Sequence, residues 1–541
     1  LNHYDKHEQI ASARYRGEEV TMKEALHLLE EKIARVSDPS QILHYRGHGN
    51  FGLMQQVSDH FFAAYGATLT EGSLCDGAGE AGILAGRGSN RLLPPEQIEK
   101  AEVVIVWGRN IHTTNSHLLP FLKDKKIIVI DPVRTKMAES ADFHLQLKPQ
   151  GDLYLALLLS RFVVINSMEE SAFLEAYAPE YEEFYEVTQT VRIKAVLDSI
   201  DVSLGDVGRI IEMIEGKRTV ILAGVGIQKY RNGDEVMRAI DSLGALLGLF
   251  GKEGCGVNFM GNAREGIDSP FNHTSKAKPV TIGDVDFGRF EMAFIQGANP
   301  LNQMPDSNRV RASVAKNPFV VYFGLYENET SKIADLVIPA KNFLHKDDIR
   351  SSYGHPGLLA MPKVQESDLG ISEYALSAGL CRAFDIEIDS ELSYLDHFQS
   401  FAQSGEDETL VKGRETIPYS AGFDTEDGMF CFLEEYSFDA DLENDLFLLT
   451  VKSERSLNSQ FERQEKVHLN ASHGFKEGER VRISSDKGAL ELDVALDERL
   501  RDDCLLIYSG TPGVNVLTDS KLSYEGKNAA YQEKKIKVEK C

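Results

Sequence analysis

The sequence predicts an α/β protein with two α/β units built on mostly parallel sheets, followed by a C-terminal, mostly-β, barrel-like domain. Apolar strands over 102–110 and 125–135 each follow a helical or loop segment, which is the alternation of a parallel sheet. The same alternation starts again over 218–233, as a strand, a glycine turn and a helix. From about residue 447, apolar and polar residues alternate around a Lys-Gly turn, which is typical of a β-hairpin.

Other elements fit this plan. Residues 21–36 have apolar positions three and four apart, and Thr21 with Glu24 can form a capping box, so a helix is predicted. A strand, a glycine-rich turn and a helix follow over 42–66. Further strands are predicted at 290–300, 318–330 and 334–340.

Length and charge exclude several classes of protein. The 541 residues are enough for roughly three to four domains. The 84 acidic residues outnumber the 58 basic ones, and the net charge of −26 argues against a nucleic-acid partner and against binding to anionic lipid. No run of about 18 apolar residues occurs, so no direct membrane insertion is expected.

The cysteines bear on metal binding and on compartment. Six of them are scattered without a CxxC pair, so the chain offers no zinc ribbon or iron–sulfur ligand set of its own. The chain begins with Leu1 rather than Met, so we expect that an N-terminal segment was removed or left out, together with any targeting signal.

Cys75, in the stretch TEGSLCDGAGEAGI, has three interpretations: a small buried residue, a nucleophile or a soft metal ligand. No histidine lies close in sequence to act as the base that a nucleophile needs. A thiolate ligand needs only a metal that is presented by another group. Without further context, we favour the buried interpretation.

Glycine-rich turns and polar residues follow several predicted strands. Turns with Gly47 and Gly49, and with Gly224 and Gly226, would let backbone N–H groups approach a phosphate, although ordinary tight turns explain them as well. At the end of a strand, a carboxylate can accept hydrogen bonds from the N–H donors of guanine, and an arginine can bind a phosphate. Candidates of this kind are Gly108, Asn110, Asp131, Arg134, Gly151 and Asp152. Asp152 could also, or instead, be a helix N-cap.

A dense polar segment, HKDDIRSSYGHP over 345–356, carries His345, Arg350 and His355. It could line a pocket or form a solvated loop. Single histidines elsewhere in the chain are expected to be structural.

The motifs GHGNFG, SLCDGAG, VWGRN, IDPVRT, GVGIQKYRNG, GANPLNQ, ETSKIADLVIPA, LNSQF and GVNVLT occur in this order between about residues 18 and 540. In this series the chain resembles the large catalytic subunits of the molybdopterin oxidoreductase family, the dimethyl sulfoxide reductase superfamily. That family includes formate dehydrogenases, periplasmic nitrate reductases and polysulfide or thiosulfate reductases. Any one motif is weak, whereas the ordered series is specific.

The resemblance implies a molybdenum or tungsten ion held between two pyranopterin guanine dinucleotides, one bound by each α/β unit. The first dinucleotide is expected to contact Gly47, Gly49, Gly108, Asn110, Asp131, Arg134, Gly151 and Asp152. The second is expected to contact Gly224, Gly226, Gln228, Gly297 and Asn299, and the β domain to contribute Asn458, Gln460 and Asn515.

The resemblance also implies domain boundaries. They are a helical lead-in (1–40), a first cofactor-binding α/β domain with linking helices (41–165 and 335–440), a second such domain (166–334) and a barrel-like molybdopterin dinucleotide-binding domain (441–541).

Cys75 stands where family members place a cysteine or selenocysteine that ligates the metal, so the ligand interpretation becomes the favoured one. Asp76 is expected to accept a proton beside the metal, or to cap the following helix; His345, Arg350 and His355 are expected to line the substrate pocket. Formate dehydrogenases have a histidine where this chain has Asp76, and an arginine where it has Gly261, with Arg264 three residues on. These departures argue against formate as the substrate.

The resemblance finally implies an enzyme that passes electrons to iron–sulfur clusters. A [4Fe–4S] cluster is expected on an N-terminal segment outside this sequence or on a separate electron-transfer subunit. The location is expected to be cytoplasmic, or periplasmic if a twin-arginine signal was removed. The alternative is a pterin-free scaffold, like the large iron–sulfur subunit of respiratory complex I. Neither the substrate nor the choice between molybdenum and tungsten can be predicted.

Overall fold

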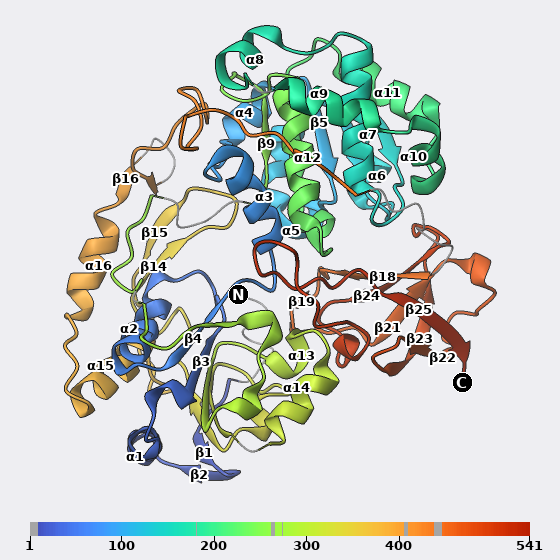
Figure 1. Cartoon of the computed structure of the whole chain (residues 1–541). Helices are drawn as coiled ribbons and strands as arrows, with labels where there is room; N and C mark the ends of the chain where they lie inside the picture. The colour runs from blue at the N-terminus through green and yellow to red at the C-terminus, as the bar shows by residue number, and fades with distance from the viewer. Residues whose placement is uncertain are drawn as a thin grey trace. The chain divides into compact units, whose positions relative to one another are not determined.

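The computed structural model describes residues 9–179, 181–260, 266–272, 274–316, 318–404, 409–437 and 446–541. The chain forms two compact units (Figure 1). Unit 1 comprises Leu1–Gly72, Ala263–Arg414 and Arg455–Arg463. Unit 2 comprises Ser73–Asn262, Glu415–Glu454 and Gln464–Cys541.

Unit 1 contains an eight-stranded sheet. Its strands, in spatial order, are β10 (Val280–Thr281), β4 (Thr68–Glu71), β3 (Ile42–Arg46), β11 (Met292–Gln296), β12 (Phe319–Gly324), β13 (Leu336–Pro339), β1 (Ala13–Tyr15) and β2 (Glu18–Val20). The strands from β10 to β13 are parallel, and β1 and β2 add an antiparallel edge. These two short strands lie in the segment that was predicted as a helical lead-in.

Helix α1 (Met22–Arg35) confirms the helix predicted after that edge. The side chain of Thr21 accepts a hydrogen bond from the backbone N–H of Glu24 (3.2 Å), and the Glu24 carboxylate accepts one from the N–H of Thr21 (2.8 Å), which completes the predicted capping box. The buried face of α1 packs in one core with strands of the sheet and with helices α2 (Val57–Tyr65) and α15 (Glu373–Ala383).

The rest of unit 1 consists of short elements. They are helices α13 (Pro300–Gln303), α14 (Ser307–Val314) and α16 (Glu391–Gln399), and the hairpins β14–β15 (Asp348–Ser351 and Leu358–Met361), β16–β17 (Ala402–Ser404 and Thr409–Val411) and β19–β20 (Ser456–Leu457 and Gln460–Phe461).

Unit 2 contains a five-stranded parallel sheet. Its order is β7 (Phe143–Leu145), β6 (Lys126–Ile130), β5 (Val103–Trp107), β8 (Thr219–Ala223) and β9 (Gly256–Asn258). Alternate residues enter different cores, as the pleat of a strand requires: Val104 and Val106 join one cluster, and Ile105 and Trp107 the other.

Helices cover both faces of this sheet. Helices α3 (Gly77–Arg87), α7 (Asp152–Ile165) and α12 (Gly233–Leu246) pack on the Ile105 face, next to β5 in Figure 1. The other helices of this region are α4 (Pro95–Lys100), α5 (Ile111–Thr114), α6 (Lys136–Glu139), α8 (Ser171–Tyr177), α9 (Tyr181–Thr190), α10 (Ile193–Ile200) and α11 (Leu204–Ile214).

A closed six-stranded barrel completes unit 2. Its order is β18 (Leu446–Val451), β24 (Cys504–Tyr508), β21 (Lys466–Leu469), β23 (Ala489–Leu496), β22 (Arg480–Ser484) and β25 (Lys535–Lys540). Leu448, Val467, Val481, Val494 and Leu505 fill its interior. The predicted hairpin is the antiparallel pair β22–β23. The predicted fold class, two parallel α/β sheets and a terminal barrel, is confirmed.

The strand pairing divides the chain differently from the predicted domain boundaries. Strand β3 pairs with β11, and β5 pairs with β8, so residues 42–71 and 280–339 share one sheet while 103–258 form the other. Parallel strands are joined by crossover connections, which let the chain leave a sheet and return to it much later. The order of elements along the chain therefore did not reveal which of them pair.

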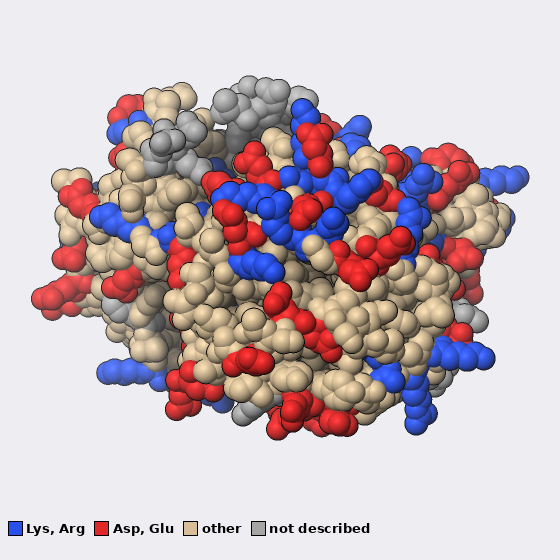
Figure 2. Space-filling view, turned by 90° about the horizontal axis from the view of Figure 1, so that it is seen from above, with Lys and Arg blue, Asp and Glu red and all other residues tan. Residues whose placement is uncertain are grey.

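Charged side chains of both signs are interspersed on the face shown in Figure 2. Ion pairs of unit 2 such as Lys100–Glu253 (2.5 Å) and Lys126–Asp142 (2.7 Å) are exposed and contribute little to stability. Among the described residues, no helix is both long enough and apolar enough to span a bilayer.

The close approach of two turns in unit 2 gives a first test. A Cβ added at Gly224 would lie 2.1 Å from the backbone oxygen of Gly108. Gly224→Ala should therefore lower the free energy of unfolding by about 1–3 kcal/mol. A Cβ at Gly208, inside α11, meets nothing within 4 Å, so Gly208→Ala should leave stability unchanged or raise it by about 0.5–1 kcal/mol. Urea denaturation of the two variants measures this difference, and equal midpoints would contradict the close packing of the two turns.

Candidate functional site

The Cys75 loop lies in unit 2, directly before α3. The hydroxyl oxygen of Ser73 accepts hydrogen bonds from the backbone N–H of Cys75 (2.9 Å) and of Asp76 (3.2 Å), and the hydroxyl donates to the Asp76 carboxylate (3.0 Å). Asp76 occupies the N-cap position of α3, but its side chain makes no capping hydrogen bond. The half-buried thiol of Cys75 therefore stands on a loop whose backbone is fixed locally.

Two lysines of unit 2 interact electrostatically with Cys75. Lys229 donates a hydrogen bond to the backbone oxygen of Leu74 (2.8 Å), and desolvation lowers the pKa of Lys229 to about 8. Desolvation also lowers the pKa of Lys452, while the charge of Cys75 acts in the opposite direction on both lysines. Both lysines therefore lie within electrostatic range of the Cys75 side chain. Neither lysine was predicted from the sequence, where no pattern links them to Cys75.

Four of the predicted glycines repeat one arrangement, in which a turn glycine donates its N–H to a carbonyl at the end of the neighbouring parallel strand. The acceptors are Ile130 for Gly108 (2.8 Å), Trp107 for Gly224 (2.8 Å), Gln296 for Gly47 (2.8 Å) and Phe323 for Gly297 (2.9 Å). Gly108 and Gly297 have positive φ angles of 58° and 56°, which favour glycine.

Each pair of neighbouring glycines takes one member from each of the two predicted sets of dinucleotide contacts. A Cβ at Gly47 would lie 2.5 Å from the oxygen of Gly297, so Gly47 and Gly49 share unit 1 with Gly297 and Asn299. Gly224, Gly226 and Gln228 share unit 2 with Gly108. In each unit, the glycines that lie together follow strands that are far apart in the sequence but close together in the sheet.

Two desolvated carboxyl groups lie at the strand ends of unit 2. Asp131 accepts a hydrogen bond from the N–H of Val133 (2.8 Å), and Asp152 accepts one from the indole N–H of Trp107 (2.7 Å). Desolvation raises the pKa of each carboxyl group to about 7, and the charge of Asp152 adds to the effect on Asp131. Asp152 follows Gly151, which is the N-cap residue of α7, so the predicted N-cap role of Asp152 is wrong.

Three other predicted residues of unit 2, Asn110, Arg134 and Asn515, lie outside its strands. Asn110 follows β5, and its side-chain oxygen is buried without a hydrogen-bond partner among the described residues. Arg134 is exposed. Asn515 is buried, and its side-chain oxygen accepts a hydrogen bond from the Thr518 hydroxyl (3.1 Å).

Asn299 of unit 1 makes several hydrogen bonds within the protein. Its amide nitrogen donates to the Glu329 carboxylate (2.7 Å) and to the Ser459 hydroxyl (3.0 Å), and its side-chain oxygen accepts from the Thr330 hydroxyl (2.9 Å). Ser459 lies between β19 and β20, so Asn299 holds the hairpin that carries Asn458 and the exposed Gln460.

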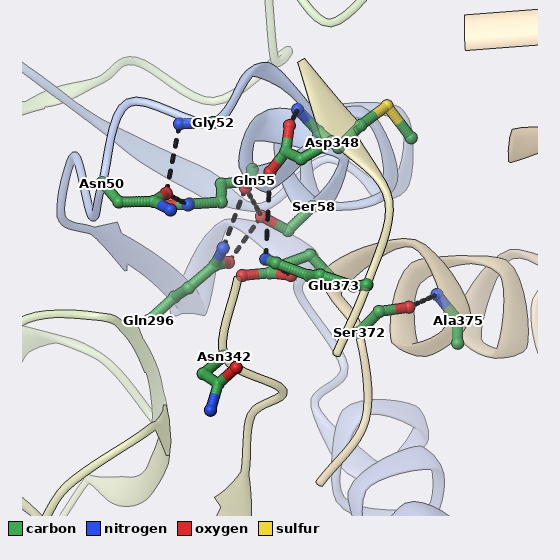
Figure 3. Close-up of polar contacts among 12 residues, drawn as sticks. Asn50, Gly52, Gln55, Ser58, Gln296, Asn342, Asp348, Ser372, Glu373 and Ala375 are labelled. Carbon is green, nitrogen blue, oxygen red and sulfur yellow. Dashed lines mark hydrogen bonds and ion pairs between the residues drawn. The ribbon is translucent and has the colours of Figure 1, made fainter. Parts of the chain in front are cut away.

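A polar network holds the segment from Asn50 to Ser58, which follows the turn with Gly47 and Gly49 (Figure 3). The Asp348 carboxylate accepts hydrogen bonds from the backbone N–H of Met54 (3.0 Å) and of Ile349 (2.8 Å). Gln296 donates to the backbone oxygen of Gln55 (2.8 Å) and accepts from the Ser58 hydroxyl (2.5 Å).

Charged groups surround Asp348. Burial raises the pKa of Asp348 to about 6, although the charge of Lys346 opposes this, and Lys346 itself forms an ion pair with Glu373. The sequence did not single out Asp348; its only signal was the density of charged residues in HKDDIR.

The predicted pocket residues lie in unit 1. His345 is buried, and its Nδ1 has no hydrogen-bond partner among the described residues. Arg350 forms a backbone bridge with Gly52, and its side chain is exposed. Nδ1 of His355 accepts a hydrogen bond from the N–H of Gly357 (3.0 Å). Gly261 and Arg264 lie outside the described residues.

Comparison with known proteins identifies the family. The model of the molybdopterin oxidoreductase family matches residues 16–356, and that of the molybdopterin dinucleotide binding domain matches residues 446–534. The chain belongs to the molybdopterin oxidoreductase family. The predicted resemblance is therefore confirmed, and the protein is a molybdopterin-dependent enzyme whose C-terminal barrel is a dinucleotide-binding domain.

Individual relatives are distant. The probable oxidoreductase YoaE of Bacillus subtilis is 26% identical over 97% of this chain and 88% of that protein. The probable oxidoreductase YyaE of the same organism is 27% identical over 62% of this chain, which spans only 54% of that protein. The fold of acetylene hydratase from Pelobacter acetylenicus superimposes with a TM-score of 0.80 at 16% identity, covering 99% of this chain and 92% of that one. The names of the two Bacillus relatives identify no substrate.

Trp107 is the only tryptophan and reports directly on Asp152. In the cofactor-free protein, its emission should titrate with a midpoint near the pKa of about 7. Asp152→Asn keeps an acceptor for the indole N–H and should abolish the titration. The pKa of about 7 in the folded protein exceeds the ordinary 3.8, so stability should fall as pH rises between these values, and the variant should reduce that slope. An identical titration in Asp152→Asn would contradict this assignment.

Asp348 should be needed to hold the segment around Met54 in unit 1. Asp348→Ala leaves the buried N–H of Met54 without its acceptor and should cost about 1–3 kcal/mol. Asp348→Asn keeps an acceptor oxygen and is the matched control. Amide hydrogen exchange over residues 50–56 should accelerate in the alanine variant and stay near wild type in the asparagine variant. Equal protection in all three proteins would show that Asp348 does not hold this segment.

Proposed function

We propose that this chain is the catalytic subunit of a molybdenum- or tungsten-dependent oxidoreductase that binds two pyranopterin guanine dinucleotides. When bound, the metal would supply two-electron redox chemistry toward a small-molecule substrate. The observation that carries the proposal is the position of Cys75, a half-buried thiol on a loop whose backbone is fixed by Ser73 and Lys229.

The described residues fit the guanine dinucleotide. In unit 2, Asp131 and Asp152 are desolvated carboxyl groups with unused acceptor capacity, and the oxygen of Asn110 is buried without a partner among the described residues. Guanine offers N–H donors that suit such acceptors. The turns at Gly108 and Gly224 can bring backbone N–H groups close to a pyrophosphate.

We propose a second dinucleotide in unit 1, where the turns at Gly47 and Gly297 repeat the same hydrogen bond. Gly49 and the hairpin carrying Asn458 and Gln460 would add contacts there. Asn299 would act by holding that hairpin through Ser459. Asn515, Arg134, Gly151 and Gly226 remain predicted contacts of the dinucleotide in unit 2.

Cys75 would ligate the metal, and Asp76 would accept a proton from the substrate. The hydrogen bond from Ser73 holds the Asp76 carboxylate next to the Cys75 backbone, which supports this role. Asp76 also takes the place of the histidine expected in formate dehydrogenases, so we propose a substrate other than formate. His345, Arg350 and His355 would contact the substrate.

Electrons would pass to iron–sulfur clusters outside this chain's 541 residues, on a further segment or on a partner subunit with a [4Fe–4S] cluster. We propose a cytoplasmic location, or a periplasmic one if a twin-arginine signal directs export. Neither a nucleic-acid partner nor membrane insertion by this chain forms part of the proposal.

Metal and nucleotide content test the proposal. Protein produced with full cofactor supply should contain about one molybdenum or tungsten and release about two GMP per chain. X-ray absorption should show one sulfur ligand fewer in Cys75→Ser, whereas Cys541→Ser, which changes an exposed thiol, should match wild type. Protein without metal and without GMP would reject the proposal and favour a pterin-free scaffold.

A further inference from the structure

Gln228 lies in the short 3-10 turn Val225–Gln228, and its side chain is fully buried. Its amide nitrogen donates hydrogen bonds to the backbone oxygens of Cys75 (2.6 Å) and Val225 (3.2 Å). Its side-chain oxygen accepts one from the backbone N–H of Gly79 in the first turn of α3 (2.9 Å). The two carbonyl partners and the one N–H partner fix which end of the amide carries the nitrogen.

These contacts leave no amide donor of Gln228 for a cofactor, because both N–H groups are used within the protein. The sequence predicted Gln228 as a cofactor contact. The hydrogen bonds connect it instead to the backbone that carries Cys75.

The backbone of Cys75 is held on both sides of its Cα. Ser73 accepts from its N–H at 2.9 Å, and Gln228 donates to its C=O at 2.6 Å. The next residue of the same turn region, Lys229, donates to the preceding carbonyl, that of Leu74 (2.8 Å). With the backbone fixed in this way, the direction of the Cα–Cβ bond of Cys75 is set, and only rotation about that bond is left to place the sulfur.

We propose that Gln228 is a positioning residue that aims the Cys75 thiolate at the metal. This inference rests on the proposed role of Cys75 as the ligand. A metal–sulfur bond depends on where the sulfur lies, and supporting contacts around a ligand decide how well it is held. Gln228 contributes such support, since it ties the ligand loop to the start of α3 and to the glycine turn after β8.

Only an amide meets all three contacts. A carboxylate would place an oxygen against the carbonyls of Cys75 and Val225, and a methionine would keep the volume without any hydrogen bond.

Gln97 offers a matched control within unit 2. It is also buried, its amide nitrogen donates to the oxygen of Thr416 (2.9 Å), and its oxygen accepts from the N–H of Gly254 (2.8 Å). Its two hydrogen bonds join segments that do not carry Cys75.

The experiment compares Gln228→Met and Gln228→Glu with Gln97→Met, in both metal-free and cofactor-loaded protein. In metal-free protein, the rate at which iodoacetamide alkylates Cys75 is followed by mass spectrometry of its peptide. Loss of the hydrogen bond to Cys75 should loosen the loop and raise this rate at least about fivefold in Gln228→Met. Gln97→Met should react like wild type. In loaded protein, X-ray absorption should show a longer or more disordered metal–sulfur bond in the Gln228 variants only.

Gln228→Glu keeps the volume and the acceptor for Gly79, so it tests the lost donor even if the methionine variant folds poorly. Wild-type alkylation and metal spectra in both Gln228 variants would overturn the proposal. Equal changes in Gln228→Met and Gln97→Met would also overturn it, because they would indicate general loosening of unit 2. If the metal spectrum of Cys75→Ser matches wild type, the proposed ligand itself is rejected, and the positioning role with it. The Cys75 variant thus separates failure of the function from failure of the inference.

Discussion

The structure depends on one repeated hydrogen bond at the ends of parallel strands. After β3, β5, β8 and β11, a turn glycine donates its backbone N–H to a carbonyl at the end of the adjacent strand, at 2.8–2.9 Å in each case. The contact requires two turns to lie backbone against backbone: a Cβ added at Gly224 would lie 2.1 Å from the oxygen of Gly108, and one added at Gly47 would lie 2.5 Å from the oxygen of Gly297. No Cβ fits at Gly47 or Gly224, and the positive φ angles of Gly108 and Gly297 favour glycine there, so each of these turns depends on a residue without a side chain.

Both units place costly polar groups beside those turns. Asp131 and Asp152 in unit 2, and Asp348 in unit 1, have pKa values raised by desolvation. A desolvated carboxyl group without a cation weakens folding and is usually found where a binding partner repays the cost. Through one oxygen, Asp348 accepts hydrogen bonds from the backbone N–H groups of Met54 and Ile349, and its other oxygen is buried without a hydrogen-bond partner among the described residues. Asp131 and Asp152 accept one hydrogen bond each, from Val133 and from Trp107. All three carboxyl groups therefore keep acceptor capacity, which suits a ligand that offers N–H groups.

Local features could be predicted from the sequence, and pairings could not. The strands 103–107 and 126–130 are apolar runs that any parallel sheet would bury, and the Thr21–Glu24 capping box is fixed by residues three apart. The partnership of Gly47 with Gly297 follows from strand order, which no local pattern contains. Strands β1 and β2 were missed because each is only three residues long and carries little apolar signal. Gln228 was assigned to the cofactor because its motif gave its position but not the direction of its amide.

Cys75 is a single cysteine, and its sequence neighbourhood alone does not indicate a metal ligand. Within the described residues, no three His, Cys, Asp or Glu side chains converge to form a metal site, so the protein offers Cys75 as a single thiol. A single thiol holds a metal firmly only when other ligands come with the metal, as the dinucleotide-binding family of this chain implies. The protein then has one task at this point, which is to fix the sulfur. Ser73 and Gln228, on opposite sides of the Cys75 backbone, perform that task with four hydrogen bonds to the backbone between Cys75 and Gly79.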